Sequence, residues 1–140
     1  MPRKSLILAG LGLSAVVPLV VAGPAQASDS YHKAYTVESD SIGTAKQGGV
    51  VYFKEHDDLV SVCDNDTDGY SAELDVYVGN TLRYHLSDGG DDGICDNAAG
   101  YWGGAYNLPE HTNIKFVTYL YDGDTGKFTG GVSHTWYNDN

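Results

Sequence analysis

Alternation of apolar and polar residues with a period of two constrains the fold of this chain more than any other feature. Between residues 72 and 78 the even positions are apolar, whereas the acids Glu73 and Asp75 occupy odd positions, as in a strand with one buried face. Gly79-Asn80 is a two-residue turn signal, and the alternation resumes after it. The sequence therefore predicts a β-hairpin over residues 71–86.

Strand signals of the same kind recur along the rest of the chain. Four further segments are rich in β-branched and aromatic residues: 50–53, 59–63, 114–121 and 128–136. Turns rich in glycine and aspartate separate them, and no window after residue 27 has a helical period. Seven to eight short strands predict an all-β fold, a single antiparallel β-sandwich that is immunoglobulin-like in general architecture.

The first 27 residues have the composition of a secretory signal peptide. Arg3 and Lys4 form a positively charged start, an uncharged run follows, and Ala25-Gln26-Ala27 supplies the small residues at a cleavage site. An uncleaved membrane anchor is the alternative, but the run is shorter than the about 20 residues of a spanning helix and contains Pro18. We therefore expect a signal peptide helix over residues 1–27 that is removed on secretion.

Removal of this leader would leave one exported domain, with an arm or first strand over residues 28–48 and the β-sandwich over residues 49–140. It would take away two of the eight basic residues and none of the nineteen acids, which changes the net charge from −11 to −13. Such a surface repels nucleic acid and anionic lipid. We therefore expect neither nucleic acid nor, after cleavage, a membrane as partner, and we expect an extracellular protein or polysaccharide instead.

Cys63 and Cys95 are the only cysteines of the chain. Two cysteines in an exported domain predict one disulfide. Closing a loop of this length would stabilise the fold by roughly 3.5 to 4 kcal/mol in the chain-entropy model. A structural zinc site wants four nitrogen or sulfur ligands, so these two residues alone do not predict one.

The stretch CDNDTDGYSAELD, which starts at Cys63, places carboxylates at alternate positions before a glycine. Calcium takes six to eight oxygen ligands, and EF-hand loops space their ligands in this way. The predicted calcium ligands come from this stretch and from the acidic cluster around Cys95: Asp64, Asp66, Asp68, the Tyr70 carbonyl, Asp75, Asp91, Asp92 and Asp96. Strand signals on both sides exclude a helix–loop–helix hand, and aspartates are also ordinary turn formers. A calcium site and a plain turn therefore both remain open.

The chain contains no catalytic motif that predicts an enzyme. Its five histidines are scattered without the spacing of a zinc protease, and no nucleophile elbow of the form GxSxG occurs. With nineteen acids, the choice of a carboxylate pair for glycoside hydrolysis is arbitrary. We therefore predict a non-enzymatic protein that requires no cofactor, with calcium as the one candidate ion.

The segment YWGGAY carries three aromatic residues next to glycines: Tyr101, Trp102 and Tyr106. Such residues can form a platform that stacks on sugar rings, or an anchor in a protein interface. Large aromatic residues also serve as core residues in a small sandwich. These three residues are the predicted ligand-binding candidates.

One longer stretch carries a resemblance to a known group of proteins. VYFKEHDDLVSVCDNDTDGYSAELDVYV, behind its leader, resembles the small secreted β-sandwich proteins of streptomycetes and related actinomycetes, which are mostly uncharacterised. The matching positions are Asp64, Asp68, Gly69 and Ser71 in a D-x-x-x-DG turn, and the likeness extends over residues 49–136. It implies a compact sandwich and export, but no activity.

These features predict a secreted, acidic protein that acts by binding. Binding of calcium by the aspartate loops is the most specific version of this prediction. Two alternatives remain open. One is a proteinaceous inhibitor or toxin-like effector whose acidic surface docks on a basic target. The other is a carbohydrate-binding module that uses Tyr101, Trp102 and Tyr106.

Overall fold

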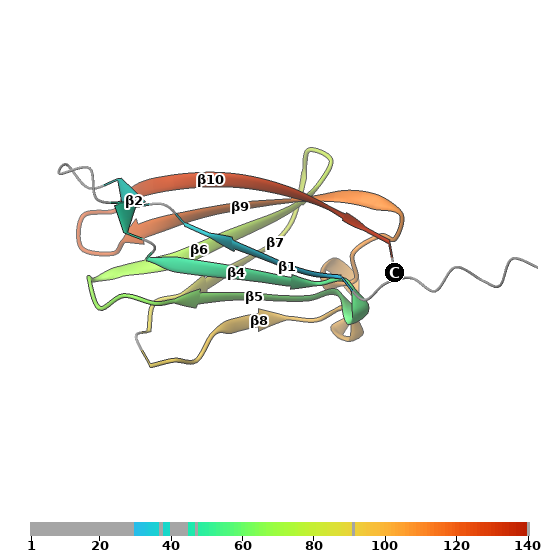
Figure 1. The fold of residues 1–140 in the computed structure, drawn as a ribbon, viewed down its shortest axis with the longest axis horizontal. Helices are drawn as coiled ribbons and strands as arrows, with labels where there is room; N and C mark the ends of the chain where they lie inside the picture. Colours follow the sequence, from blue (N-terminus) through green and yellow to red (C-terminus); the bar gives the residue numbers. More distant parts are fainter. Residues whose placement is uncertain (1–29, 37, 40–44, 47, 91, 140) are drawn as a thin grey trace, which may run out of the picture.

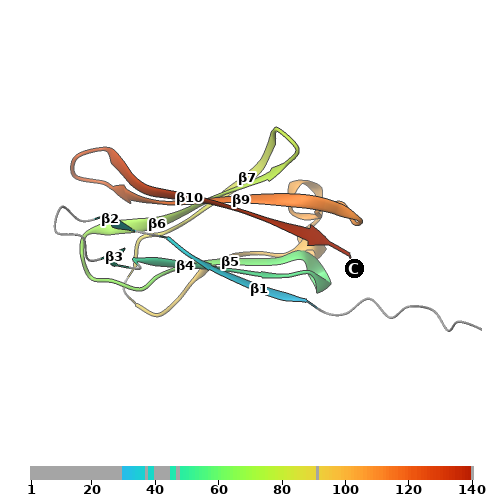
Figure 2. The same cartoon turned by 45° about the horizontal axis from the view of Figure 1, so that its top comes forward.

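Two antiparallel sheets of four strands each form the molecule, as the computed structural model shows for residues 30–36, 38–39, 45–46, 48–90 and 92–139. The strand order is β1-β4-β5-β8 in the first sheet and β10-β9-β6-β7 in the second. Figure 1 shows the strands from one side, and the turned view in Figure 2 separates the two layers. The predicted all-β sandwich is confirmed. The expected leader and Asp91 lie outside the described residues.

The first sheet begins within the segment that was predicted to be an arm or a first strand. Its strands are β1 (Tyr31–Tyr35), β4 (Gly49–Lys54), β5 (Leu59–Asp64) and β8 (Asp96–Ala98). A separate small pair consists of β2 (Glu38–Ser39) and β3 (Ala45–Lys46), and the 3-10 helix η1 (His56–Asp58) connects β4 to β5. Because β1 pairs with β4, this segment supplies an edge strand of the sandwich.

The second sheet contains the longer strands. They are β6 (Tyr70–Val78), β7 (Thr81–Asp88), β9 (Thr112–Asp122) and β10 (Lys127–Asn138). Strands β6 and β7 form the predicted hairpin, with Val78 opposite Thr81. Two 3-10 helices, η2 (Gly100–Trp102) and η3 (Gly104–Tyr106), precede β9.

The core lies between the two sheets and is built from the inward positions of the strands. Phe53 of β4 and Phe116 of β9 are fully buried, and their ring centroids are 5.0 Å apart. Trp136 of β10 packs on Phe116 at 4.9 Å. On β9 the residues that alternate with the buried ones are half-buried, among them Tyr119 and Tyr121. The outer face of the second sheet therefore carries large side chains that partly cover one another.

The predicted disulfide between Cys63 and Cys95 is confirmed. Cys63 lies in β5, and Cys95 immediately precedes β8, the strand that pairs with β5. The bond therefore ties the connection between β7 and β8 to the first sheet. Within the described part of the chain, no helix has the length and apolar character needed to cross a bilayer.

Candidate functional site

The aspartate-rich loop after β5 uses its carboxylates to bond its own backbone. Asp64 Oδ1 accepts a hydrogen bond from the Asp66 N–H at 3.1 Å, and Asp68 Oδ1 accepts one from the Tyr70 N–H at 3.0 Å. Gly69 has a φ of 86°, which is the left-handed conformation that glycine adopts without strain. Bonds of this kind, from an aspartate to the N–H two residues further on, are typical of turns.

The second acidic cluster also bonds backbone groups. The buried Asp88 accepts the Asp64 N–H through Oδ2 at 2.7 Å, which connects the end of β7 to the end of β5. Asp92 accepts the Ile94 N–H at 2.9 Å, and Asp96 accepts the Ser87 N–H at 3.2 Å. The acids near Cys95 therefore also organise the turns in which they stand.

The predicted calcium ligands are only partly brought together. Asp64 and Asp66 border one open hollow of about 270 Å³, next to Tyr70, whereas Asp75 lies five residues further along β6 and bonds other side chains. Among the described residues, no three His, Cys, Asp or Glu side chains form a group that could hold a metal ion. In the same part of the chain, Asp68 Oδ2 is buried without a hydrogen-bond partner. The hydrogen bonds favour the plain turn, and calcium binding stays a prediction.

The aromatic candidates divide into two exposed residues and one half-buried residue. Tyr101 and Trp102 in η2 are 78% and 53% exposed, and their rings meet edge to face. Tyr106 in η3 is half-buried, with its ring centroid 5.0 Å from that of the buried Tyr84. Tyr101 and Trp102 can therefore contact a ligand directly. The Tyr106 ring packs edge to face against the Trp102 ring, with their centroids 5.5 Å apart.

A third group of residues, on the outer face of the second sheet, was missed by the sequence analysis. Strand β6 presents Glu73 and Asp75 on this face. The register places Ser87 and Tyr119 beside Glu73, and it places His85 beside Asp75. Residues from three strands, far apart in the sequence, therefore meet on one face.

Glu73 is the centre of this group. It is only 5% exposed although it lies on the outer face. Its Oε1 accepts hydrogen bonds from the hydroxyls of Ser71 at 2.6 Å and Ser87 at 2.9 Å, and its Oε2 lies 2.7 Å from His85 Nε2. A buried carboxylate needs such partners, because an unpaired charge away from water is costly.

His85 bridges the two acids. Its second ring nitrogen, Nδ1, lies 2.8 Å from Asp75 Oδ1. Both nitrogens can donate to the carboxylates only in the imidazolium form, which carries a proton on each. With two carboxylic acids and one imidazole, the group of Glu73, His85 and Asp75 is acidic in composition.

The tyrosines beside Asp75 remain neutral hydrogen-bond donors. Burial, together with the negative charges of Asp75 and Glu73, raises the pKa of Tyr119 to about 12. The charge of Asp75 also raises the pKa of Tyr77, whose hydroxyl lies 3.4 Å from Asp75 Oδ2. The polar group is therefore pre-ordered by bonds between side chains of β6, β7 and β9.

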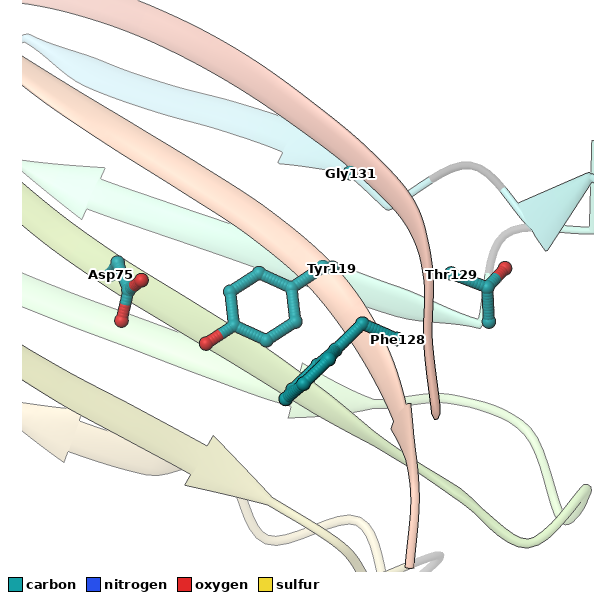
Figure 3. Close-up of a pocket in the computed structure, with 5 residues that line it drawn as sticks. All are labelled: Asp75, Tyr119, Phe128, Thr129 and Gly131. Carbon is teal, nitrogen blue, oxygen red and sulfur yellow. The ribbon is translucent and has the colours of Figure 1, made fainter. Parts of the chain in front are cut away.

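Three adjoining hollows run along this face, and we call them together the outer groove. The first, of about 420 Å³, is lined by Asp75, Tyr119, Phe128, Thr129 and Gly131 and is drawn in Figure 3. The second, of about 330 Å³, shares Tyr119 and Phe128 with it and adds Glu73, His85, Ser87 and Tyr121. The third, of about 400 Å³, shares Glu73, Ser87 and Tyr121 and adds Gly69, Tyr70, Ser71, Gly89 and Gly123. The hollow beside Asp64 and Asp66 continues from its far end.

Fold and groove together define the molecule as an acidic antiparallel β-sandwich with a polar and aromatic groove on one sheet. No protein-family model, no curated protein and no solved structure matches the chain.

Proposed function

We propose that this chain is a secreted, non-enzymatic binding protein whose outer groove docks an extended, basic segment of a partner protein. The observation that carries the proposal is the composition of the groove walls. They combine Glu73 and Asp75 with the rings of Tyr119, Tyr121 and Phe128, and none of the described residues that line the three hollows is Lys or Arg. Acidic walls next to aromatic rings suit a cationic chain.

The size of the groove fits a short extended peptide. It follows β6 from Asp75 to Tyr70, which is six residues of strand. At about 3.3 Å per residue this is roughly 20 Å, the length of an extended segment of about six residues. The continuing hollow at Asp64 and Asp66 offers two more carboxylates to a longer segment.

The hydrogen bonds in the groove favour binding over catalysis. Ser71 and Ser87 both donate their hydroxyl protons to Glu73, and neither is bonded to a histidine nitrogen. A serine nucleophile needs a base within hydrogen-bond reach, and both ring nitrogens of His85 face carboxylates instead. The polar groups therefore hold one another in place, as in a preformed binding surface.

Titration calorimetry with a hexalysine peptide tests this proposal, with hexaglutamine as the neutral control. We expect hexalysine alone to bind, with an affinity that falls as the salt concentration rises. Asp75→Asn should weaken binding about tenfold, which is about 1.4 kcal/mol. Asp92→Asn removes the same charge from an exposed loop outside the groove, and its amide oxygen can still accept the Ile94 N–H.

The matched pair separates docking in the groove from general attraction between a basic peptide and an acidic protein. If Asp75→Asn and Asp92→Asn weaken hexalysine equally, the peptide does not use the outer groove. If hexalysine does not bind at low salt, a basic segment is not the partner.

Polysaccharide binding is a second candidate function, supported by the exposure of Tyr101 and Trp102. Two aromatic rings that project from one 3-10 helix can stack on sugar rings. Retention on insoluble polysaccharide tests this function, and Trp102→Ala should abolish it without lowering the melting temperature. A variant that is retained like the original protein would remove this candidate.

A further inference from the structure

The first hollow of the outer groove exists because no side chain of β10 stands opposite Tyr119. Thr129 pairs with Leu120 and Val132 pairs with Thr118, so the register is interrupted beside Tyr119 by a bulge. Gly131 lies in this bulge, and a Cβ atom at its position would meet no heavy atom within 4 Å. The outer face of the sheet is therefore open at this position of β10, where a side chain would normally pack beside Tyr119.

Two aromatic rings form the walls of this hollow. The Tyr119 and Phe128 rings meet at 77° with their centroids 5.4 Å apart, so the corner between them presents a face of each ring. In Figure 3 the Tyr119 ring lies between Asp75 and the Phe128 ring. Phe128 is 67% exposed, so its ring is accessible to a ligand. A cation in such a corner is attracted by the electron-rich faces of both rings.

The carboxylate of Asp75 supplies the charge for this corner. Its Oδ1 is bonded to His85, its Oδ2 has a long contact with the Tyr77 hydroxyl at 3.4 Å, and the Tyr119 hydroxyl also bonds this carboxylate. The two oxygens of a carboxylate accept about four hydrogen bonds, so Asp75 can accept one more. Lys115, the outward neighbour of Tyr77, lies with Nζ over the Tyr77 ring at 4.5 Å, so its charge is engaged there.

These features suit a guanidinium better than an ammonium. A guanidinium is flat, weakly hydrated and able to stack on a ring while it donates to a carboxylate, whereas an ammonium is compact and strongly hydrated. The corner offers ring faces and one accepting oxygen, not a cage of oxygens. We infer that the first hollow binds the guanidinium of one arginine of the docked segment, which lies in the corner formed by Tyr119 and Phe128 and is bonded to Asp75. This inference rests on the proposed function and names the anchor of the partner.

A set of three peptides tests the anchor. They are hexalysine, the same peptide with one lysine replaced by arginine, and the same peptide with citrulline, the uncharged analogue of arginine, at that place. We expect the arginine peptide to bind about tenfold more tightly than hexalysine and the citrulline peptide to bind most weakly. Phe128→Ala should remove the preference for arginine, while Tyr101→Ala, which removes an exposed ring elsewhere, should preserve it.

The results separate the arginine anchor from the docked basic segment. If all three peptides bind but without preference, or if the preference persists in Phe128→Ala, the arginine anchor is overturned and the basic segment stands. A direct measurement uses acetyl-arginine methylamide, whose binding should shift the ring resonances of Tyr119 and Phe128 in NMR spectra. Such shifts without binding of hexalysine would support the anchor and overturn the longer docked segment. If neither the peptides nor acetyl-arginine methylamide bind, both are overturned.

Discussion

The acids of the loop after β5 and the acids on the outer face of β6 show how differently the same carboxylates are used. Asp64 and Asp68 bond backbone N–H groups two residues further on, and this shapes the loop. Glu73 and Asp75 bond side chains that come from neighbouring strands. The first arrangement is local and fixes a turn. The second needs the assembled sheet, and it presents charge together with aromatic rings, which makes it the better binding surface.

The largest expected effect comes from removal of the disulfide beside the loop. The double variant Cys63→Ala/Cys95→Ala opens a loop with a sequence separation of 32. We expect the free energy of unfolding to fall by roughly 3.5 to 4 kcal/mol, because the unfolded chain regains its freedom. Urea unfolding measures this change. Folded double-variant protein should keep its affinity for hexalysine, because no cysteine lines the outer groove. A loss of binding without a loss of stability would contradict the distinction between loop and face.

Glu73→Ala tests how strongly the acids on the outer face of the second sheet stabilise the fold. It should have the next largest effect on the free energy of unfolding. The substitution leaves two serine hydroxyls and one ring nitrogen of His85 without their acceptor. Because Ser71 is half-buried and Ser87 and His85 are exposed, water can replace part of these bonds. A hydrogen bond to a charged group contributes about 1.5 to 3 kcal/mol, so we expect a loss of about 2 kcal/mol in the free energy of unfolding. Asp92→Ala, in the exposed loop, is the control and should cost about 0.5 kcal/mol or less. Equal losses for the two variants would show that Glu73 is no more integrated than a loop acid.

Local signals were sufficient to predict the fold and the turns. Alternation with a period of two identified the hairpin of β6 and β7, because one face of each strand packs into the core. The pairing of Cys63 with Cys95 followed from the absence of any other cysteine. These features depend on neighbours in the sequence or on a simple count, and for this reason they could be predicted.

The outer groove depends on register, which the sequence does not display. A regular two-residue hairpin would place Asp75 opposite Tyr84. An irregularity between Val76 and Tyr77 shifts the pairing, and His85 stands there instead. The hollow next to Phe128 depends on a second irregularity, in β10. Such bulges redirect a side chain by one residue. Gly130-Gly131 inside the predicted strand is a signal for the second one, but no turn or glycine residue marks the first one, at Val76 and Tyr77. Asp75 was therefore assigned to a metal site, while Glu73 and His85 were missed.

Two buried acids at opposite ends of η1, Glu55 and Asp58, predict a smaller effect on stability that depends on pH. Asp58 is 3% exposed, and burial raises its pKa although it accepts bonds from the Leu108 N–H and the Asn138 amide. Burial likewise raises the pKa of Glu55, with a further contribution from Asp139. Each group then binds protons more tightly in the folded protein than in the unfolded chain, so the free energy of unfolding falls as pH rises through the folded pKa.

The stabilisation is complete only below the unfolded pKa values of 3.8 for Asp58 and 4.5 for Glu55, and it is lost above the raised ones. We therefore expect the contribution of these two groups to the free energy of unfolding to fall as pH rises from about 3.5 through the raised pKa values, by on the order of 1 kcal/mol for each unit by which a pKa is raised. Urea unfolding from about pH 3.5 to about pH 8 measures this trend, and Asp58→Asn, which cannot titrate, should flatten it. If the free energy of unfolding of that variant changes with pH as in the original protein, burial does not raise the pKa of Asp58.

The smallest expected effect is that of calcium on the loop, and it tests whether the loop acids serve only the turn. Asp64 and Asp68 each accept a backbone N–H two residues further on, so the turn is formed by its own hydrogen bonds and needs no ion to hold it. We therefore expect the melting temperature of decalcified protein to stay constant up to 10 mM calcium, as in a magnesium control. A native-state ligand at 100 times its dissociation constant would add about 2.7 kcal/mol, several degrees for a domain of this size. A saturating rise that Asp66→Asn/Asp68→Asn abolishes would make the loop a metal site. The acids of the loop would then bind a ligand, as we propose for the acids on the outer face of β6, in addition to shaping the turn.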